Sequence, residues 1–182
     1  HSARRSTSSA PMSIMKYRSI CIVMMLGAAS MVSHAGYWRP AACRMNIASP
    51  ITVYSTVIGV GENNDLTAYL PQGLPWPGRQ TLKLIDIASP ATGQPLAEPA
   101  KSVLNSWVTG KWVRIEIHGN DPNCFPLVEI HDELGSVNLR LVEQGYAWVT
   151  MQPRADARFM SAELRARKAK RGLWANTYSK PP

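Results

Sequence analysis

VNLRLVEQGYAWV, residues Val137–Val149, has the pattern of a short helix followed by a short strand. Gly145 is placed to end the helical part, because glycine is the residue that most often follows a helix. A second informative stretch, Thr81–Gly93, reads TLKLIDIASPATG. Its Thr, Leu and Ile residues favour a strand, and Ser89-Pro90 closes that strand into a turn. Helix and strand signals therefore alternate in this part of the chain.

Five stretches predict β-strands because they are rich in β-branched residues or alternate apolar with polar residues. The expected strands are Ile51–Val60, Leu66–Leu70, Thr81–Ile87, Lys111–His118 and Phe125–His131. The proline in the last strand marks it as starting late or lying on a sheet edge. Two further helices are expected at Ala97–Gly110 and Asp156–Trp174. Five short strands, with helices after the third and the fifth, predict a small β-barrel with packed helices.

The beginning of the chain has the pattern of an export signal. Residues 1–11 are polar and are interpreted as an expression tag or upstream translation. Lys16 and Arg18 precede an apolar run over residues 20–32, and Ser33-His34-Ala35 has the small-x-small form of a cleavage site. We therefore expect three parts: residues 1–35 removed, an extension over 36–50, and a domain over 51–182. The mature chain is expected to be periplasmic or secreted, and to have no membrane span.

The net charge of the mature chain is mildly basic. The whole chain carries +8, and the four basic residues before position 36 are accompanied by no acid, so 8 − 4 leaves +4. This charge permits binding to a polyanion without showing it. The mature cysteines, Cys43 and Cys124, have neither the spacing nor the neighbours of a zinc site. Their spacings from His118 and His131 match no zinc-binding motif.

Three stretches together resemble the staphylococcal nuclease-like (thermonuclease) family, whose fold is an OB-fold barrel. They are LKLIDIASP (82–90), VNLRLVEQGYAWV (137–149) and AELRARKAKRGLW (162–174), in the family's order and spacing. The resemblance covers Ile51–Trp174. It implies an α+β fold, namely a five-stranded OB-fold barrel with three helices.

The resemblance also implies where the family's active site should lie. In that family two Asp residues hold calcium, a Glu positions water and two Arg residues neutralise the phosphate. The equivalent positions here are Asn64 and Ala88 for the metal ligands, Ala91 for the Glu, and Lys83 and Phe125 for the arginines. Alanine offers calcium no oxygen, and phenylalanine cannot bind phosphate. The sequence therefore predicts no catalytic residues, no metal and no cofactor at these positions.

An alternative register keeps the enzyme reading open. If the end of the third strand were shifted, Asp86 could bind calcium together with Asp65 or Glu62. That shift supplies neither the Glu nor the second Arg. The alternative function is a divergent secreted calcium-dependent nuclease that hydrolyses DNA or RNA.

The leading hypothesis is an exported, catalytically inactive domain that acts as a binding module for nucleic acid or for an envelope protein. The basic candidates for weak, salt-sensitive nucleic-acid binding are Lys83, Lys111, Arg114, Arg165, Arg167 and Lys168. Four aromatic residues are expected in the core, with a base-stacking platform as the alternative: Trp107, Trp112, Tyr146 and Trp148. Trp76 lies in a Pro/Gly loop that should expose it, so it is the candidate for contact with a partner.

We predict a disulfide between Cys43 and Cys124. The exported compartment favours pairing, and the bridge would enclose 124 − 43 = 81 residues of chain. Loops of that order stabilise by about 4 kcal/mol on the chain-entropy model. Alkylation and intact-mass analysis, with and without reductant, should show two protected thiols in protein taken from its native compartment. Two freely alkylated cysteines would contradict the bridge.

Overall fold

The computed structural model describes residues 47–150 and 156–175, all of them within one compact unit that spans residues 37–182. The expected signal peptide and Cys43 lie outside the described residues, so export and the Cys43–Cys124 bridge stay predictions. Within the part of the chain that is described, no helix is long and apolar enough to cross a membrane.

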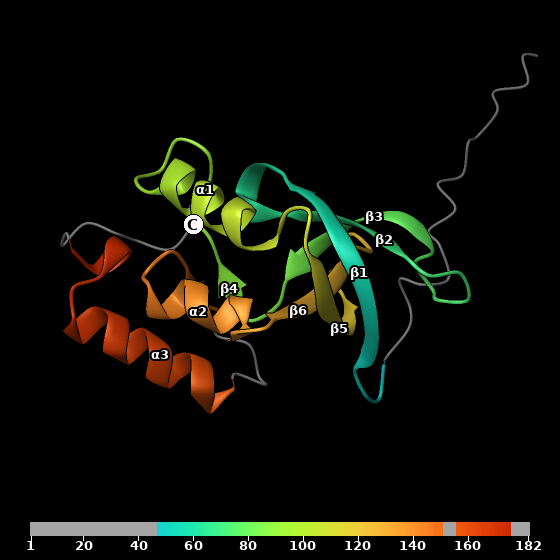
Figure 1. Cartoon of the computed structure of the whole chain (residues 1–182). Helices are drawn as coiled ribbons and strands as arrows, with labels where there is room; N and C mark the ends of the chain where they lie inside the picture. Colours follow the sequence, from blue (N-terminus) through green and yellow to red (C-terminus); the bar gives the residue numbers. More distant parts are fainter. Residues whose placement is uncertain (1–46, 151–155, 176–182) are drawn as a thin grey trace, which may run out of the picture. The chain divides into compact units, whose positions relative to one another are not determined.

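A closed, mixed β-barrel forms the centre of the unit, as the sequence predicted. Its strands are β1 (Ile51–Val60), β2 (Leu66–Leu70), β3 (Gly78–Leu84), β5 (Trp112–Asn120), β6 (Pro126–Asp132) and the short β7 (Gly135–Ser136). The order is β3-β2-β1-β5-β6-β7, and β3 also pairs with β6. This last pairing is parallel and short, with Lys83 opposite Leu127 and Leu84 opposite Val128. It closes the sheet into a barrel (Figure 1).

The third strand differs from its prediction at both ends. It starts at Gly78 rather than Thr81, and it stops at Leu84 because Ile85 and Asp86 form a turn. Asp86 has a φ of 62°, a conformation that Asp tolerates better than most residues. The chain then forms β4 (Ile87–Ala88), which leaves the barrel and pairs with β8 (Trp148–Val149).

Three helices lie on one side of the barrel (Figure 1): α1 (Ala97–Val108), α2 (Val137–Glu143) and α3 (Ala157–Lys168). The described residues also contain two short 3₁₀ segments, η2 (Glu62–Asn64) and η3 (Gly172–Trp174). The last helix is shorter than predicted, since the backbone turns at Lys170, where φ is 50°. Ser136 begins α2 by accepting a hydrogen bond from the backbone N–H of Leu139.

The core joins the barrel interior to the helices. Its largest fully buried side chains include Leu66, Leu82, Leu104, Ile115, Ile117, Ile130, Leu141 and Phe159. Trp148 is buried as expected, and Trp107 and Tyr146 are half-buried against the core.

Two predictions about tryptophan are wrong. Trp76 was expected at an exposed loop tip, but only 5% of it is exposed and it belongs to the core cluster. The loop folds back because burying an indole removes a large apolar area from water. Trp112 was expected in the core, but it is 69% exposed. The inward positions of β5 are Val113, Ile115 and Ile117, so the alternation of the strand turns Trp112 outward.

Asn138 joins α2 to the two strands that close the barrel. Its side chain is fully buried. Its Oδ1 accepts a hydrogen bond from the N–H of Ile130 at 3.1 Å, and its Nδ2 donates to the carbonyls of Val128 (3.0 Å) and Ile85 (3.2 Å). This buried amide satisfies the N–H of Ile130 and the carbonyl of Ile85, and gives the Val128 carbonyl a second donor besides the Ile85 N–H.

Gly145 and Gly172 pack directly against each other. A Cβ at Gly145 would lie 2.3 Å from the carbonyl oxygen of Arg171, and one at Gly172 would lie 2.3 Å from that of Gly145. The N–H of Leu173 also donates to the Gly145 carbonyl at 2.9 Å. Both glycines have positive φ, so the contact needs their conformation as well as their missing side chains.

We predict that Gly145→Ala is far more destabilising than Gly110→Ala. The two glycines have nearly equal φ, 75° and 76°, but a Cβ at Gly110 meets nothing within 4 Å. Gly110→Ala should therefore cost only the left-handed strain of about 1–2 kcal/mol. Gly145→Ala should add about 2 kcal/mol for the backbone overlap. Urea unfolding of both variants measures the difference, and equal costs would show that the Gly145–Gly172 contact relaxes freely.

Candidate functional site

One small pocket contains three of the five positions equivalent to the family's active site, whereas Ala91 and Phe125 are not among its lining residues. It has a volume of about 190 Å³ and lies where the β1–β2 connection faces β3 and β4. Its lining residues are Asn63, Asn64, Asp65, Lys83, Leu84, Ile87, Ala88 and Ser89. The structure thus brings together Asn64, Lys83 and Ala88, which the sequence analysis placed in one site.

Lys83 is held by two neighbours in this pocket. Its Nζ lies 2.8 Å from Oδ2 of Asp65 in a partly exposed ion pair. The same Nζ lies 5.4 Å from the centre of the Phe125 ring, within range of a cation–π interaction. The two positions equivalent to the family's arginines, Lys83 and Phe125, therefore lie near each other. The lysine charge is neutralised by Asp65 and is not left free for phosphate.

The pocket does not fit calcium. Asp65 is the one lining residue with a carboxylate, and that carboxylate is already paired with Lys83. Asn64 is buried, and its Oδ1 has no hydrogen-bond partner, so it adds one neutral oxygen. Calcium takes six to eight oxygen ligands, usually with several carboxylates. Ala91, at the position of the family's Glu, has a methyl side chain with no atom that could bind a cation. Its backbone N–H donates a hydrogen bond to Oε1 of Gln94 at 2.7 Å.

Asp86, the ligand of the alternative register, faces other groups. It does not line the pocket that contains Asp65. Burial raises the pKa of Asp86 above its usual value, and charged neighbours on β5, β6 and the start of α3 modify it further. These neighbours are His118, Glu129, Asp156 and Arg158. The turn before β4 therefore directs Asp86 toward the outer face of β5 and β6.

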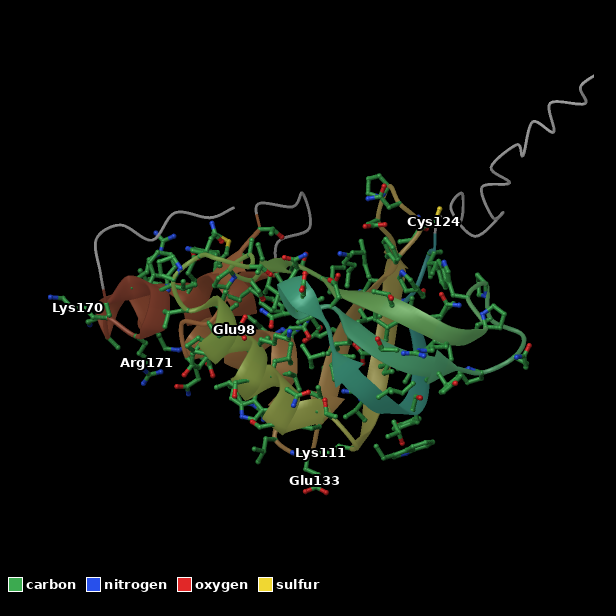
Figure 2. All side chains as sticks on the ribbon, turned by 90° about the horizontal axis from the view of Figure 1, so that it is seen from above. Glu98, Lys111, Cys124, Glu133, Lys170 and Arg171 are labelled. Carbon is green, nitrogen blue, oxygen red and sulfur yellow. The ribbon has the colours of Figure 1, made fainter. Side chains whose placement is uncertain are left out.

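The basic candidates are spread over different elements. Lys83 belongs to β3, Lys111 directly precedes β5, Arg114 lies near the start of β5, and the other three belong to α3. Figure 2 shows Lys111 beside Glu133 at one end of the β5–β6 hairpin, with Cys124 at the other end. Arg165 is paired with Glu143, and Lys168 is exposed. These six residues do not form one continuous basic surface.

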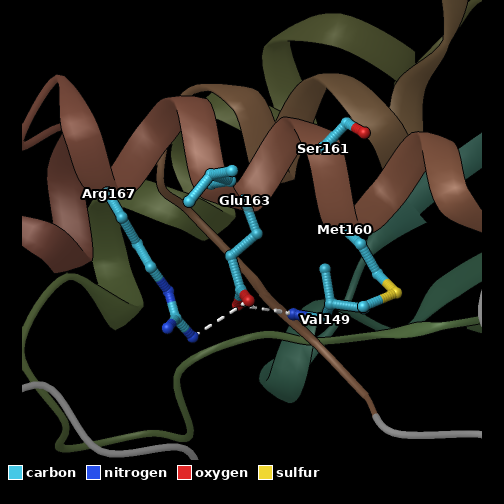
Figure 3. Close-up of a pocket in the computed structure, with 6 residues that line it drawn as sticks. Val149, Met160, Ser161, Glu163 and Arg167 are labelled. Atoms are coloured by element: carbon cyan, nitrogen blue, oxygen red, sulfur yellow. Dashed lines mark hydrogen bonds and ion pairs between the residues drawn. The ribbon is translucent and has the colours of Figure 1, made fainter.

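Arg167 has a structural role. Its Nη2 lies 2.9 Å from Oε2 of Glu163, and its guanidinium stacks 4.2 Å from the centre of the Trp174 ring. The other oxygen of Glu163 accepts a hydrogen bond from the N–H of Val149 at 3.1 Å. Figure 3 shows Glu163 between these two partners, in a pocket that Met160 and Ser161 also line. This chain of contacts fastens α3 to β8.

An exposed aromatic row crosses three strands of the barrel, and the sequence analysis named only its Trp112, as an alternative to a core position. Tyr69 on β2, Tyr54 on β1 and Trp112 on β5 are 60%, 55% and 69% exposed. Trp112 pairs with Thr56, and Tyr54 pairs with Arg114 on β5. Tyr69 pairs with the exposed Arg79 on β3. The signal was present in the sequence, since each aromatic residue occupies the outward position of an alternating strand.

The comparisons with known proteins agree with the fold described above. Residues 81–176, more than half of the chain, match the family described as staphylococcal nuclease homologue. A Haemophilus influenzae protein named an uncharacterized endonuclease is 30% identical over 95 residues, which cover 52% of this chain and 53% of that protein. An Escherichia coli O157:H7 protein of the same name is 29% identical over 102 residues, or 56% of this chain and 67% of that protein.

The chain spans about half the length of the Haemophilus relative that it matches. The family match begins within β3 and includes α1, the β5–β6 hairpin, α2 and α3, and therefore most of the described elements. It also includes Lys83, Ala88, Ala91 and Phe125, four of the positions at which the family's catalytic groups were sought. On this evidence the chain belongs to the staphylococcal nuclease homologue family.

Proposed function

We propose that this domain binds single-stranded nucleic acid without hydrolysing it, through the exposed aromatic row on β2, β1 and β5. The observation that carries the proposal is the exposure of Tyr54, Tyr69 and Trp112 on adjacent strands. Bases stack on exposed aromatic side chains, and each stacked base contributes about 1–3 kcal/mol by alanine substitution.

Two arginines flank the aromatic row and supply charge for the phosphates. Arg79 lies opposite Tyr69, and Arg114 lies opposite Tyr54. Arginine suits this place because its planar guanidinium binds phosphate and stacks on aromatic faces. Arg114 is also paired with Glu116, so part of its charge is already neutralised. We therefore expect moderate affinity that falls as salt rises.

The loss of hydrolysis is supported by the pocket around Lys83. Ala88 and Ala91 stand at the positions of a metal ligand and the catalytic Glu, and Phe125 stands at that of an arginine. The ion pair between Lys83 and Asp65 uses the remaining cation and carboxylate for each other. These substitutions favour a binding role over a catalytic one.

A calcium-dependent nuclease is the second candidate, because the relatives named above are called endonucleases. Their name describes those proteins, and this chain differs from the family pattern at the positions that carry the chemistry.

Export to the periplasm or the medium is part of our proposal and rests on the apolar run over residues 20–32. An envelope protein is the partner to consider if the aromatic row binds no nucleic acid.

The first test replaces the aromatic row. Trp112→Ala and Tyr69→Ala should each weaken binding of a fluorescent single-stranded oligonucleotide by about tenfold, since each removes a stacking platform. Leu164→Ala is the matched control, because Leu164 is also a large exposed apolar residue but lies on α3. Fluorescence anisotropy at about 50 and 200 mM salt measures both the affinity and its salt dependence.

Binding that is equally weakened by Leu164→Ala would show a non-specific apolar contribution. Affinity that is unchanged in Trp112→Ala and Tyr69→Ala would contradict the aromatic row as the site. No binding at any salt concentration would leave the envelope protein as the partner class to be tested.

The second test concerns hydrolysis. We predict no cleavage of DNA or RNA in calcium or in chelator, because loss of one strong electrostatic group typically lowers a rate by about 10²–10³ and three are missing. Labelled substrates resolved on denaturing gels measure this, with Asp65→Ala purified in parallel to reveal a contaminating nuclease. Cleavage that chelator stops and Asp65→Ala abolishes would establish the nuclease instead.

A further inference from the structure

A second polar cluster lies on the outer face of β5 and β6, apart from the pocket around Lys83. Glu116, Glu129 and His131 each direct one ligand atom into it, and these atoms lie within 4.8 Å of one another. The sequence predicted no metal, because it has neither a zinc-binding spacing around the cysteines nor the family's calcium-binding aspartates. The cluster forms only when the two strands are paired.

The register of the hairpin creates the cluster. Glu116 pairs directly with Glu129, and Arg114 pairs with His131, one step along the same face. Carboxylates directly opposite each other repel and destabilise a sheet. Glu129 is also only 4% exposed, so water cannot screen that repulsion fully. Such a pair requires compensating positive charge.

Arginine supplies this charge to one oxygen of each carboxylate and leaves the other oxygen turned inward. Arg114 binds Oε1 of Glu116, and Arg158 lies 3.4 Å from Oε2 of Glu129. The remaining oxygens face Nε2 of His131, at 3.4 Å for Glu116 Oε2 and 3.8 Å for Glu129 Oε1. Both Glu129 Oε1 and His131 Nε2 are buried and have no hydrogen-bond partner.

These distances fit ligands around a small cation better than a hydrogen-bonded ion pair. An N–H···O hydrogen bond has its donor and acceptor about 2.9 Å apart, which is shorter than either distance here. Ligands at about 2.1 Å from a tetrahedral zinc ion are separated from one another by about 3.4 Å. Three ligand atoms within 4.8 Å of one another, two of them without a hydrogen-bond partner, leave room for one ion between them.

We propose that Glu116, Glu129 and His131 form a zinc site on the outer face of the barrel. One imidazole nitrogen with two carboxylate oxygens suits zinc, whereas calcium and magnesium prefer oxygen ligands alone. The fourth position is open to water or to His118, whose Nε2 lies 3.9 Å from Glu116 Oε2 and is also buried without a partner. Zinc would join β5 to β6 and, through Arg158 and Glu129, to the start of α3.

Zinc titration of the purified full chain tests this site directly. After dialysis against chelator, isothermal titration with zinc chloride should show a tight equivalent that Glu129→Gln and His131→Gln weaken by about 10- to 100-fold or more. Glu133→Gln is the matched control, since it removes one acidic charge near the end of β6 without touching the cluster. Its affinity should stay within twofold of the native value. Calcium and magnesium should give no comparable binding.

A thermal-unfolding measurement gives a second readout that does not depend on activity. Saturating zinc should raise the Tm of the native chain and of Glu133→Gln by several degrees, because a ligand that binds only the folded state stabilises it. Glu129→Gln and His131→Gln should show no such rise, while their circular dichroism confirms that they fold. Native protein that binds no zinc, or variants that bind it as tightly through other groups such as His1 or His34, would overturn the proposal.

Discussion

The buried amide of Asn138 is the interaction on which the closed barrel depends most. The parallel contact between β3 and β6 consists of two residue pairs, so few ladder hydrogen bonds hold it. Asn138 reinforces it from α2 by binding Val128 on β6 and Ile85 just after β3. The N–H of Ile85 donates to the same Val128 carbonyl at 2.9 Å. Loss of the amide would remove the partner of the Ile130 N–H and of the Ile85 carbonyl, at about 1–3 kcal/mol each, while the Val128 carbonyl would keep its bond from Ile85.

The end of β3 also decides where the polar groups can act. Lys83 precedes the turn and stays in the barrel wall, where it reaches Asp65. Asp86 follows Ile85 and turns toward Glu129 and His118 instead. The two carboxylates that the alternative register would combine are thus committed to different neighbours. The same turn separates the two carboxylates. As a result, the charges in the pocket around Lys83 are paired, whereas several charged side chains gather on the outer face of β5 and β6.

Much of this architecture could be predicted from local pattern. VNLRLVEQGYAWV specified a helix, a glycine stop and a strand, and the structure contains α2, Gly145 and β8 in that order. The errors concern features that depend on distant contacts. Closure of the barrel sets the turn at Asp86 and the burial of Trp76. The alternation of inward and outward positions along β5 sets the orientation of Trp112. The approach of Glu116 to Glu129 depends on hairpin register, which composition and spacing do not encode.

The contact between Gly145 and Gly172 has a consequence for how the protein responds to proteolysis. Leu173 is buried and its N–H binds the Gly145 carbonyl, so η3 is fastened to the connection between α2 and β8. A carboxypeptidase that trims the chain past Leu173 would remove this hydrogen bond and uncover apolar surface on α3 together.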